Sequence, residues 1–189
     1  AMNATAAALF VSALPFEGTI LAHSNESEWQ TFRNNKNNEA FLDRVFIVKV
    51  PYCLRVDEEV HIYEKLLRDS TLSDAPCAPG TLGMMAQFSV LTRLKEPENS
   101  SIYSKMRVYN GENLKDTDPK AKSIQEYQDY AGVDEGMSGI STRFAFKILS
   151  QVFNFDHQEV AANPVHLLYV LEKQIAREQL PPEMQERYL

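Results

Sequence analysis

Three polar side chains are candidates for binding an anionic ligand: Asn25, Arg44 and Arg143. Arginine is always charged, and its rigid fork of N–H donors matches the oxygens of a phosphate or carboxylate group. The amide of an asparagine can orient a water molecule or a phosphate through its own donors and acceptor. These residue types therefore indicate chemistry on a phosphate or a carboxylate, provided that the surrounding elements bring them to a ligand.

Asn25 follows the segment Thr19–Ser24, whose apolar content predicts a short buried strand. Ligands of open α/β sheets bind beyond the carboxyl ends of strands, so an amide at this position is well placed to orient a ligand. The alternative is that Asn25 is only the N-cap of the next helix. Glu28, three residues on, completes a capping-box pattern.

Arg44 directly precedes Val45–Val50, whose β-branched and aromatic residues predict a mostly buried strand that Pro51 ends. This order places a guanidinium group at the rim of a sheet. The alternative is a surface ion pair with Asp43 or Glu39, because isolated charged residues are usually solvated.

Arg143 lies in the first turn of a helix that Ser141 is predicted to cap, after the glycine-rich stretch Gly132–Gly139. A cation there faces the positive end of the helix dipole, which costs roughly 0.3–1 kcal/mol. The free N–H groups of the same helix end suit an anion, so a phosphate between them and the guanidinium offsets that cost. Alternatively, Arg143 forms an ion pair with Asp134 or Glu135.

The remaining chain positions these residues on a sheet fragment followed by helices. Beyond Pro51 the sequence predicts helices with apolar faces, with caps at Asp57, Thr81, Ser141 and Asn163 and a short helix over Ser123–Ala131. The last helix is predicted to bury Leu168 and to stop at Pro181-Pro182. The polar stretch of residues 95–122 is either a mobile insertion or contains a β-hairpin around Asn110-Gly111. The predicted fold class is mainly α with a small β portion, in which the end of an α/β core precedes a helical, lid-like domain.

The bulk composition excludes several function classes. The net charge is -7 and the isoelectric point about 5.1, which argues against nucleic acid as the main partner. No run of residues is apolar for long enough to cross a bilayer, so no membrane partner is expected. The two cysteines and four histidines lack the spacing of a disulfide framework or a metal site, and a cytoplasmic location is expected.

Taken in chain order, Asn25, Arg44 and Arg143 resemble sensor 1, the arginine finger and sensor 2 of AAA+ ATPases. Whole phrases are similar to bacterial PrkA-type serine protein kinases, over a region from about Leu14 to the C-terminus. These phrases are Ala22–Trp29, Asn99–Met106, Asp116–Lys122, Tyr130–Gly136 and Ala161–Val165.

The resemblance implies an ATP-dependent kinase that uses Mg²⁺ and phosphorylates Ser or Thr on protein substrates. It implies that Asn25 and Arg143 bind the nucleotide and that Arg44 is catalytic, reaching from one subunit into the next within a homo-oligomer. It also implies a division into a lead-in segment (1–13), the end of the AAA+ core (14–52), a lid with an insertion at about 95–122 (53–158) and the start of a C-terminal helical region (159–189).

Two parts of a complete ATP site are not found in the sequence. A G-x-x-x-x-G-K-[ST] loop would cradle the phosphates and an acidic strand end ahead of Asn25 would hold Mg²⁺, and neither is present. We therefore expect this chain to be part of a longer protein and to be inactive alone. Two alternatives stay open: an AAA+ ATPase that remodels or proteolyses protein partners, and a non-enzymatic helical interaction module.

Overall fold

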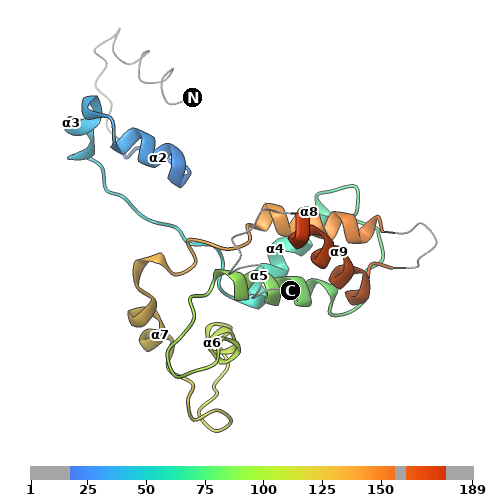
Figure 1. Ribbon diagram of the computed structural model, residues 1–189. Helices are drawn as coiled ribbons and strands as arrows, with labels where there is room; N and C mark the ends of the chain where they lie inside the picture. The colour runs from blue at the N-terminus through green and yellow to red at the C-terminus, as the bar shows by residue number, and fades with distance from the viewer. Residues whose placement is uncertain (1–17, 156–160, 178–189) are drawn as a thin grey trace. The chain divides into compact units, whose positions relative to one another are not determined.

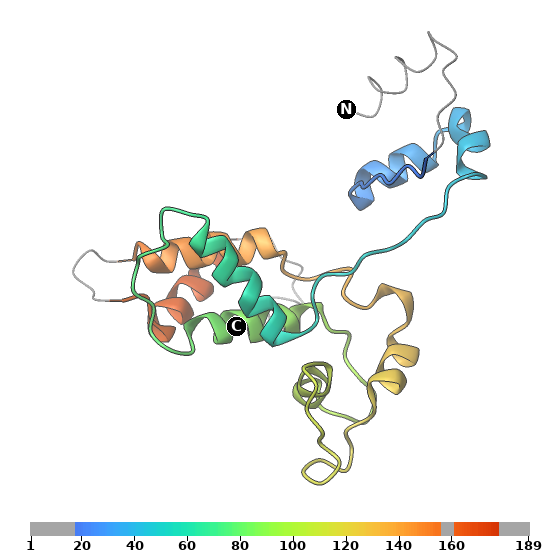
Figure 2. The same ribbon diagram turned by 180° about the vertical axis from the view of Figure 1, so that it is seen from behind.

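The computed structural model describes residues 18–155 and 161–177 and divides the chain into two units (Figures 1 and 2). The first unit ends at Val48 and the second begins at Lys49. The predicted lead-in segment, residues 1–13, lies outside the described residues.

The described part of the first unit contains three short helical elements that hold together through aromatic rings. They are α2 (Glu26–Arg33), the 3-10 helix η1 (Lys36–Asn38) and α3 (Glu39–Leu42). Phe32 stacks on Trp29 with ring centroids 6.1 Å apart and meets Phe41 edge-on at 5.5 Å. These helices bury no residue, so the described part of this unit is held by a small aromatic contact instead of a core.

The two predicted strands are wrong for this chain. Thr19–Ser24 and Val45–Val50 have no strand pairing, and their large side chains are exposed, with Leu21 at 92% and Phe46 at 91%. A strand needs a neighbour to satisfy its backbone N–H and C=O groups, and no such neighbour exists among the described residues. Their apolar composition indicates burial, but burial against something other than the described parts of this chain.

The second unit is helical, and its elements follow the predicted order closely. They are α4 (Val56–Arg68), α5 (Thr81–Arg93), α6 (Ile102–Tyr109), α7 (Ile124–Ala131), the 3-10 helix η2 (Gly132–Asp134), α8 (Thr142–Phe153) and α9 (Pro164–Arg177).

Helix α5 is central to this unit, because it contacts α4, α6, α8 and α9. Met85, Ala86 and Val90 are fully buried, and partly buried Met84 and Phe88 pack against the same core. A helix that is apolar on most sides is expected to be enclosed by other helices. Figures 1 and 2 show α4, α5, α8 and α9 as one bundle, with α6 and α7 extending from it.

Neither alternative for residues 95–122 describes what forms there. Residues 102–109 form α6, and Asn110-Gly111 ends that helix instead of turning a hairpin, with Gly111 at a φ of 96°. Glycine in this left-handed conformation is the usual residue after a helix end. An Asn-Gly dipeptide is therefore compatible with a hairpin turn and with a helix C-terminus. The Asn110 side chain also accepts a hydrogen bond from the Asp57 N–H at 3.0 Å.

That contact explains why the predicted cap of α4 is misplaced. The helix begins at Val56, one residue before Asp57, and Arg55 makes no side-chain cap. A free N–H group of its first turn is instead satisfied by Asn110, 53 positions away in the chain. Local sequence patterns do not reveal a cap donated from another helix.

Helices α8 and α9 lie side by side and close the bundle. Ser141 caps α8 as predicted, and Asn163 accepts a hydrogen bond from the His166 N–H at the start of α9. On α9, Leu167 is buried whereas the predicted Leu168 is 63% exposed. The predicted stop at Pro181-Pro182 lies outside the described residues.

The mainly α part of the predicted fold class is confirmed. The described residues contain helices and a single isolated parallel bridge between Cys77 and Ala162, which ties the α4–α5 connector to the start of α9. None of the helices in the described ranges combines the length and the apolar character needed to cross a membrane.

Candidate functional site

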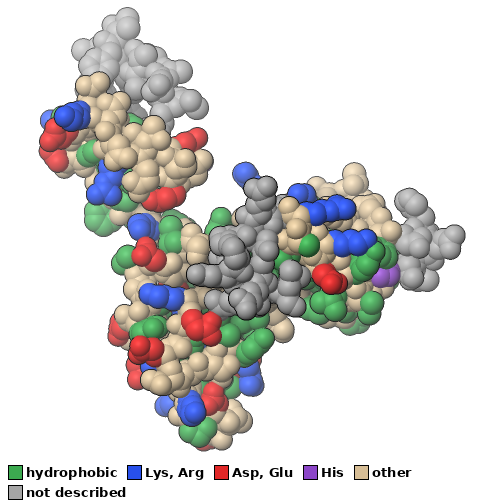
Figure 3. Space-filling view, viewed as in Figure 1, with side chains coloured by type: hydrophobic (Ala, Val, Ile, Leu, Met, Phe, Trp, Pro, Cys, Tyr) green, Lys and Arg blue, Asp and Glu red, His purple; other side chains and the backbone are tan. Residues whose placement is uncertain are grey.

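Arg143 is exposed in the first turn of α8, and neither predicted ion pair forms. Asp134 pairs with Lys49 at 3.3 Å, and Glu135 pairs with Lys105 at 2.7 Å. Figure 3 shows Lys and Arg side chains along the surface that α8 forms. The guanidinium group of Arg143 is therefore accessible to an anion beside a helix N-terminus.

The N-terminus of α8 is itself well defined. The Ser141 hydroxyl accepts the Phe144 N–H at 3.2 Å, and the Ala145 N–H donates to the Ser141 carbonyl at 3.0 Å. Ile140 is held from both sides, since its N–H donates to the Thr92 hydroxyl at 2.9 Å and its carbonyl accepts from Arg93. These hydrogen bonds thus fix the backbone of the residues that directly precede Arg143.

Arg44 is exposed just after α3, and within the described residues it makes no ion pair with Asp43 or Glu39. Its backbone N–H donates to the Phe41 carbonyl at 3.0 Å, which continues the last turn of α3. The surface-pair alternative is therefore not realised, and the guanidinium group is available to another molecule.

Asn25 is the N-cap of α2, as the sequence predicts. Its Oδ1 accepts the Glu28 N–H at 2.8 Å, while the reciprocal half of the capping box is not formed. The cap uses only the oxygen of the amide. No hydrogen bond of its NH₂ group is found in the described part of the chain, so this donor is available to a ligand.

Asn25 and Arg44 belong to the first unit, and Arg143 belongs to the second. No hydrogen bond joins Asn25 to Arg44 among the described residues. What the three share is an exposed polar group whose side-chain donors make no hydrogen bond to any other described residue. That state fits contacts to phosphate oxygens better than it fits structural ion pairs.

Sequence reasoning missed two buried ion pairs that surround the loop before Arg143. The first joins Arg93 of α5 to Glu59 of α4 at 2.7 Å, with both side chains fully buried. The second joins Lys105 of α6 to Glu135 at 2.7 Å. The sequence does contain a sign that Glu59 is buried, because it lies on the same helix face as Val56 and Tyr63. A charge on an apolar face does not, however, identify the residue that pairs with it.

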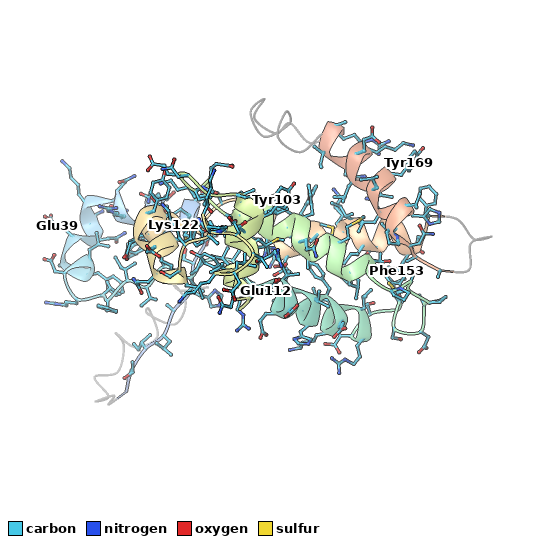
Figure 4. All side chains as sticks on the ribbon, turned by 90° about the horizontal axis from the view of Figure 1, so that it is seen from below. Glu39, Tyr103, Glu112, Lys122, Phe153 and Tyr169 are labelled. Carbon is cyan, nitrogen blue, oxygen red and sulfur yellow. The ribbon has the colours of Figure 1, made fainter. Side chains whose placement is uncertain are left out.

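The second pair is surrounded by tyrosines. The Lys105 ammonium also donates to the Lys95 carbonyl at 2.9 Å and lies 5.8 Å from the ring centroids of both Tyr109 and Tyr127. Burial, and then the charge of Glu135, raise the pKa of Tyr109 to about 12. These contacts attach α6 and α7 to the loop that leads into α8, a crowded region in which Figure 4 labels Tyr103, Glu112 and Lys122.

The described residues fit part of what an ATP·Mg²⁺ site requires. Arg143 and the Asn25 amide offer donors for phosphate oxygens. For the metal, no cluster of His, Cys, Asp or Glu suited to an ion is found in residues 18–155 and 161–177. The donors of these two side chains suit phosphate oxygens.

Comparison with known proteins supports the resemblance seen in the sequence. Residues 3–101 match the family described as the PrkA AAA domain, and residues 103–189 match the PrkA serine protein kinase C-terminal domain. The boundary between these two matches lies at the start of α6. No solved structure matches the chain.

Two curated relatives of the chain have names that state different activities. The chain is 80% identical over 95% of its length to the serine/threonine kinase YeaG of Escherichia coli K12. It is 39% identical over 90% of its length to the ATP-dependent protease PrkA of Bacillus subtilis. It spans only 28% and 27% of these two proteins. Since two family matches cover most of the chain, it belongs to the PrkA family and joins part of its AAA domain to its C-terminal domain.

Proposed function

We propose that this chain contributes the sensor and arginine-finger residues of an ATP-dependent serine/threonine protein kinase of the PrkA family. The supporting observation is 80% identity to a protein named as such a kinase, over 95% of the chain. Phosphoryl transfer relies mostly on positioning and charge stabilisation, which is the work that arginine and asparagine side chains perform. The phosphate loop and the Mg²⁺ ligands belong to parts of the protein outside this chain.

Each residue has a separate role in this proposal. The Asn25 NH₂ group orients the attacking oxygen near the γ-phosphate while its carbonyl oxygen keeps capping α2. The Arg143 guanidinium contacts the phosphates of bound ATP. The γ-phosphoryl group passes from ATP to a Ser or Thr hydroxyl on a protein substrate, and ADP and a proton are released.

Arg44 acts in a neighbouring subunit. Its exposed, unpaired guanidinium stabilises charge on the transferring phosphoryl group there, and an arginine finger of this kind contributes about 10³–10⁵ in rate. The role requires a homo-oligomer of the whole protein. The domain division at residues 14–52, 53–158 and 159–189, with a cytoplasmic location, is part of the same proposal.

A second candidate function is ATP-driven proteolysis or remodelling of protein partners. It is favoured by the name of the Bacillus subtilis relative, at 39% identity. The same three residues would serve it, because ATP hydrolysis differs from the kinase reaction only in using water as the attacking group. A purely helical interaction module describes this chain alone, which lacks the phosphate loop.

The test uses the whole protein with γ-labelled ATP and a panel of candidate protein substrates. Label on Ser or Thr of a substrate supports the kinase. Free labelled phosphate, with cleavage or unfolding of the substrate, supports ATP-driven proteolysis or remodelling. Arg143→Ala is expected to raise the KM for ATP at least tenfold. Arg68→Ala, an exposed arginine at the end of α4, is the matched control and should leave the KM unchanged. An unchanged KM in Arg143→Ala rejects the nucleotide contact.

A further inference from the structure

Arg93 makes an unusual set of contacts for a side chain that is fully buried. Its Nη2 donates to Glu59 Oε1 at 2.7 Å, its Nε to the Ile140 carbonyl at 2.9 Å and its Nη1 to the Cys53 carbonyl at 2.9 Å. The guanidinium carbon also lies 5.1 Å from the ring centroid of Tyr52. One buried cation therefore joins α4, the loop before α8 and the segment by which the chain enters the second unit.

Both members of the ion pair contact the turn that carries Arg143. Arg93 holds the carbonyl of Ile140, three residues before Arg143. The Thr142 hydroxyl, one residue before Arg143, donates to Glu59 Oε1 at 3.4 Å. The pair thus fixes the backbone on the N-terminal side of Arg143.

The same arginine fixes the beginning of the second unit. Its bond to Cys53 is accompanied by a backbone bond from the Tyr52 N–H to the Gly136 carbonyl at 2.9 Å. Gly136 in turn donates to the Arg93 carbonyl at 3.3 Å. Residues 52–53, the loop at 136–140 and the end of α5 form one connected set of hydrogen bonds.

Stability alone is a poor explanation for this arrangement. A buried ion pair recovers little more than the cost of removing two charges from water, and apolar residues of similar volume often fold as stably. Two of the three acceptors of Arg93 are backbone carbonyls from separate segments, and a rigid donor fork is suited to fixing such segments at set distances.

We propose that Arg93, held by Glu59, is a positioning residue for the ATP site, which sets the turn that presents Arg143 to the nucleotide and locks it to residues 52–53. The inference rests on the proposed nucleotide contact of Arg143 and adds a residue that never touches the nucleotide. Arg93 acts on ATP only through Arg143.

The test compares four variants of the whole protein. Arg93→Lys keeps the charge facing Glu59 but loses the fork, and the double variant Arg93→Met with Glu59→Met replaces the pair with apolar side chains of similar length. Arg143→Ala alone, and Arg143→Ala combined with Arg93→Lys, complete the set. Gln174→Met is the control, because it removes a hydrogen bond to Gln151 at 2.7 Å between α9 and α8 without removing a contact of Arg93, Glu59 or the turn.

We expect Arg93→Lys to raise the KM for ATP about tenfold, with a smaller effect on kcat, and to have no further effect in the Arg143→Ala background. Hydrogen exchange at the amides of Tyr52 and Ile140 should accelerate at least tenfold in Arg93→Lys, whereas exchange at Leu171 in α9 should stay as in the wild type. In the Gln174→Met control, exchange at Tyr52 and Ile140 should also stay as in the wild type. The Met double variant should show the same two changes with cooperative unfolding retained.

Two outcomes overturn the inference and differ from a failure of the proposed function. Unchanged exchange at Tyr52 and Ile140 in Arg93→Lys shows that Arg93 does not hold the turn. Equal rises in KM from Arg93→Lys with and without Arg143 show that Arg93 does not act through Arg143. If Arg143→Ala alone leaves the KM unchanged, the proposed function of Arg143 fails first, and the inference fails with it.

Discussion

Gly139 lies directly against the backbone of Thr92. A Cβ atom added at Gly139 would come 2.5 Å from the Thr92 carbonyl oxygen and 2.9 Å from the Arg93 nitrogen. The neighbouring Ile140 N–H donates to the Thr92 hydroxyl at 2.9 Å, so the loop and the end of α5 touch at two successive residues. Only glycine permits this approach, and it brings the start of α8 to its place beside α5.

Substituting Gly139 is therefore expected to be severe. Gly139→Ala adds a clash with backbone to a φ of 98°, so we expect it to lower the free energy of unfolding by about 3 kcal/mol or more. Gly111→Ala separates the two effects, because Gly111 has a φ of 96° and open space around it, and should cost only about 1–2 kcal/mol. Urea unfolding of the chain measures both, and equal losses would contradict the close contact.

Breaking the Lys105–Glu135 pair is expected to loosen the loop before α8. Glu135 accepts from the Lys105 ammonium at 2.7 Å and from the Lys95 N–H at 3.0 Å. Lys105→Met leaves a buried carboxylate uncompensated, and we expect a loss of about 3–5 kcal/mol in urea unfolding.

The control for that pair is an ion pair of similar length at the surface. Arg107 and Glu112 approach to 2.8 Å with side chains about half exposed. Arg107→Ala should cost less than about 1 kcal/mol, because exposed ion pairs contribute little. A Lys105→Met loss no larger than that of Arg107→Ala would show that burial of the Lys105 pair does not matter.

Asn25 allows the cap and the proposed ligand contact to be tested separately. Aspartate caps helices as well as asparagine, so Asn25→Asp should keep α2 intact, whereas Asn25→Ala should cost it about 1 kcal/mol. Aspartate has no NH₂ group and is negative beside the phosphates, so the whole protein should lose at least tenfold in kcat for ATP turnover. Normal kcat in Asn25→Asp would leave Asn25 as a cap alone.

Arg44 is testable by mixing subunits. The whole protein with Arg44→Ala should assemble normally and lose at least a hundredfold in ATP turnover, because its guanidinium would act on a neighbour's nucleotide. Mixing this variant with a second variant that cannot bind nucleotide should restore part of the activity. Some sites then combine an intact nucleotide site of the first variant with Arg44 from a neighbouring subunit of the second. Arg33→Ala, which changes an exposed arginine at the end of α2, is the matched control. Full activity of assembled Arg44→Ala excludes the finger.

The buried hydroxyl of Tyr109 is expected to cause a loss of folding stability at high pH. Its hydroxyl is buried without a hydrogen-bond partner among the described residues, and its pKa is raised to about 12, against about 10 in an unfolded chain. The folded state holds this proton more tightly, so the contribution is fully present below pH 10 and is lost as the pH rises to 12.

The measurement is urea unfolding of the chain between pH 9 and 12. The wild type should lose up to about 2 kcal/mol from this group across that range, and Tyr109→Phe should remove this part of the slope. Tyr103→Phe, on the same helix but 62% exposed, is the control and should retain the wild-type slope (Figure 4). A slope that is identical in all three proteins would contradict the prediction.

The sequence by itself determined the features that depend on near neighbours in the chain. Ser141, and Asn163 before Pro164, each start a helix where the pattern predicts it, because a cap needs only an N–H group two or three residues away. The phrases shared with the PrkA family are also runs of adjacent residues, so the family is recognisable without any knowledge of the fold.

Tertiary structure decided what depends on residues far apart in the chain. Arg93 meets Glu59 across 34 positions, Asn110 caps α4 across 53, and no local pattern specifies either partner. The segments predicted as strands stay unpaired, because a strand forms only when a neighbouring strand satisfies its backbone. The sequence thus identified Arg143 as a candidate for binding phosphate, and the packing of α4 and α5 against its loop determines where that arginine is held.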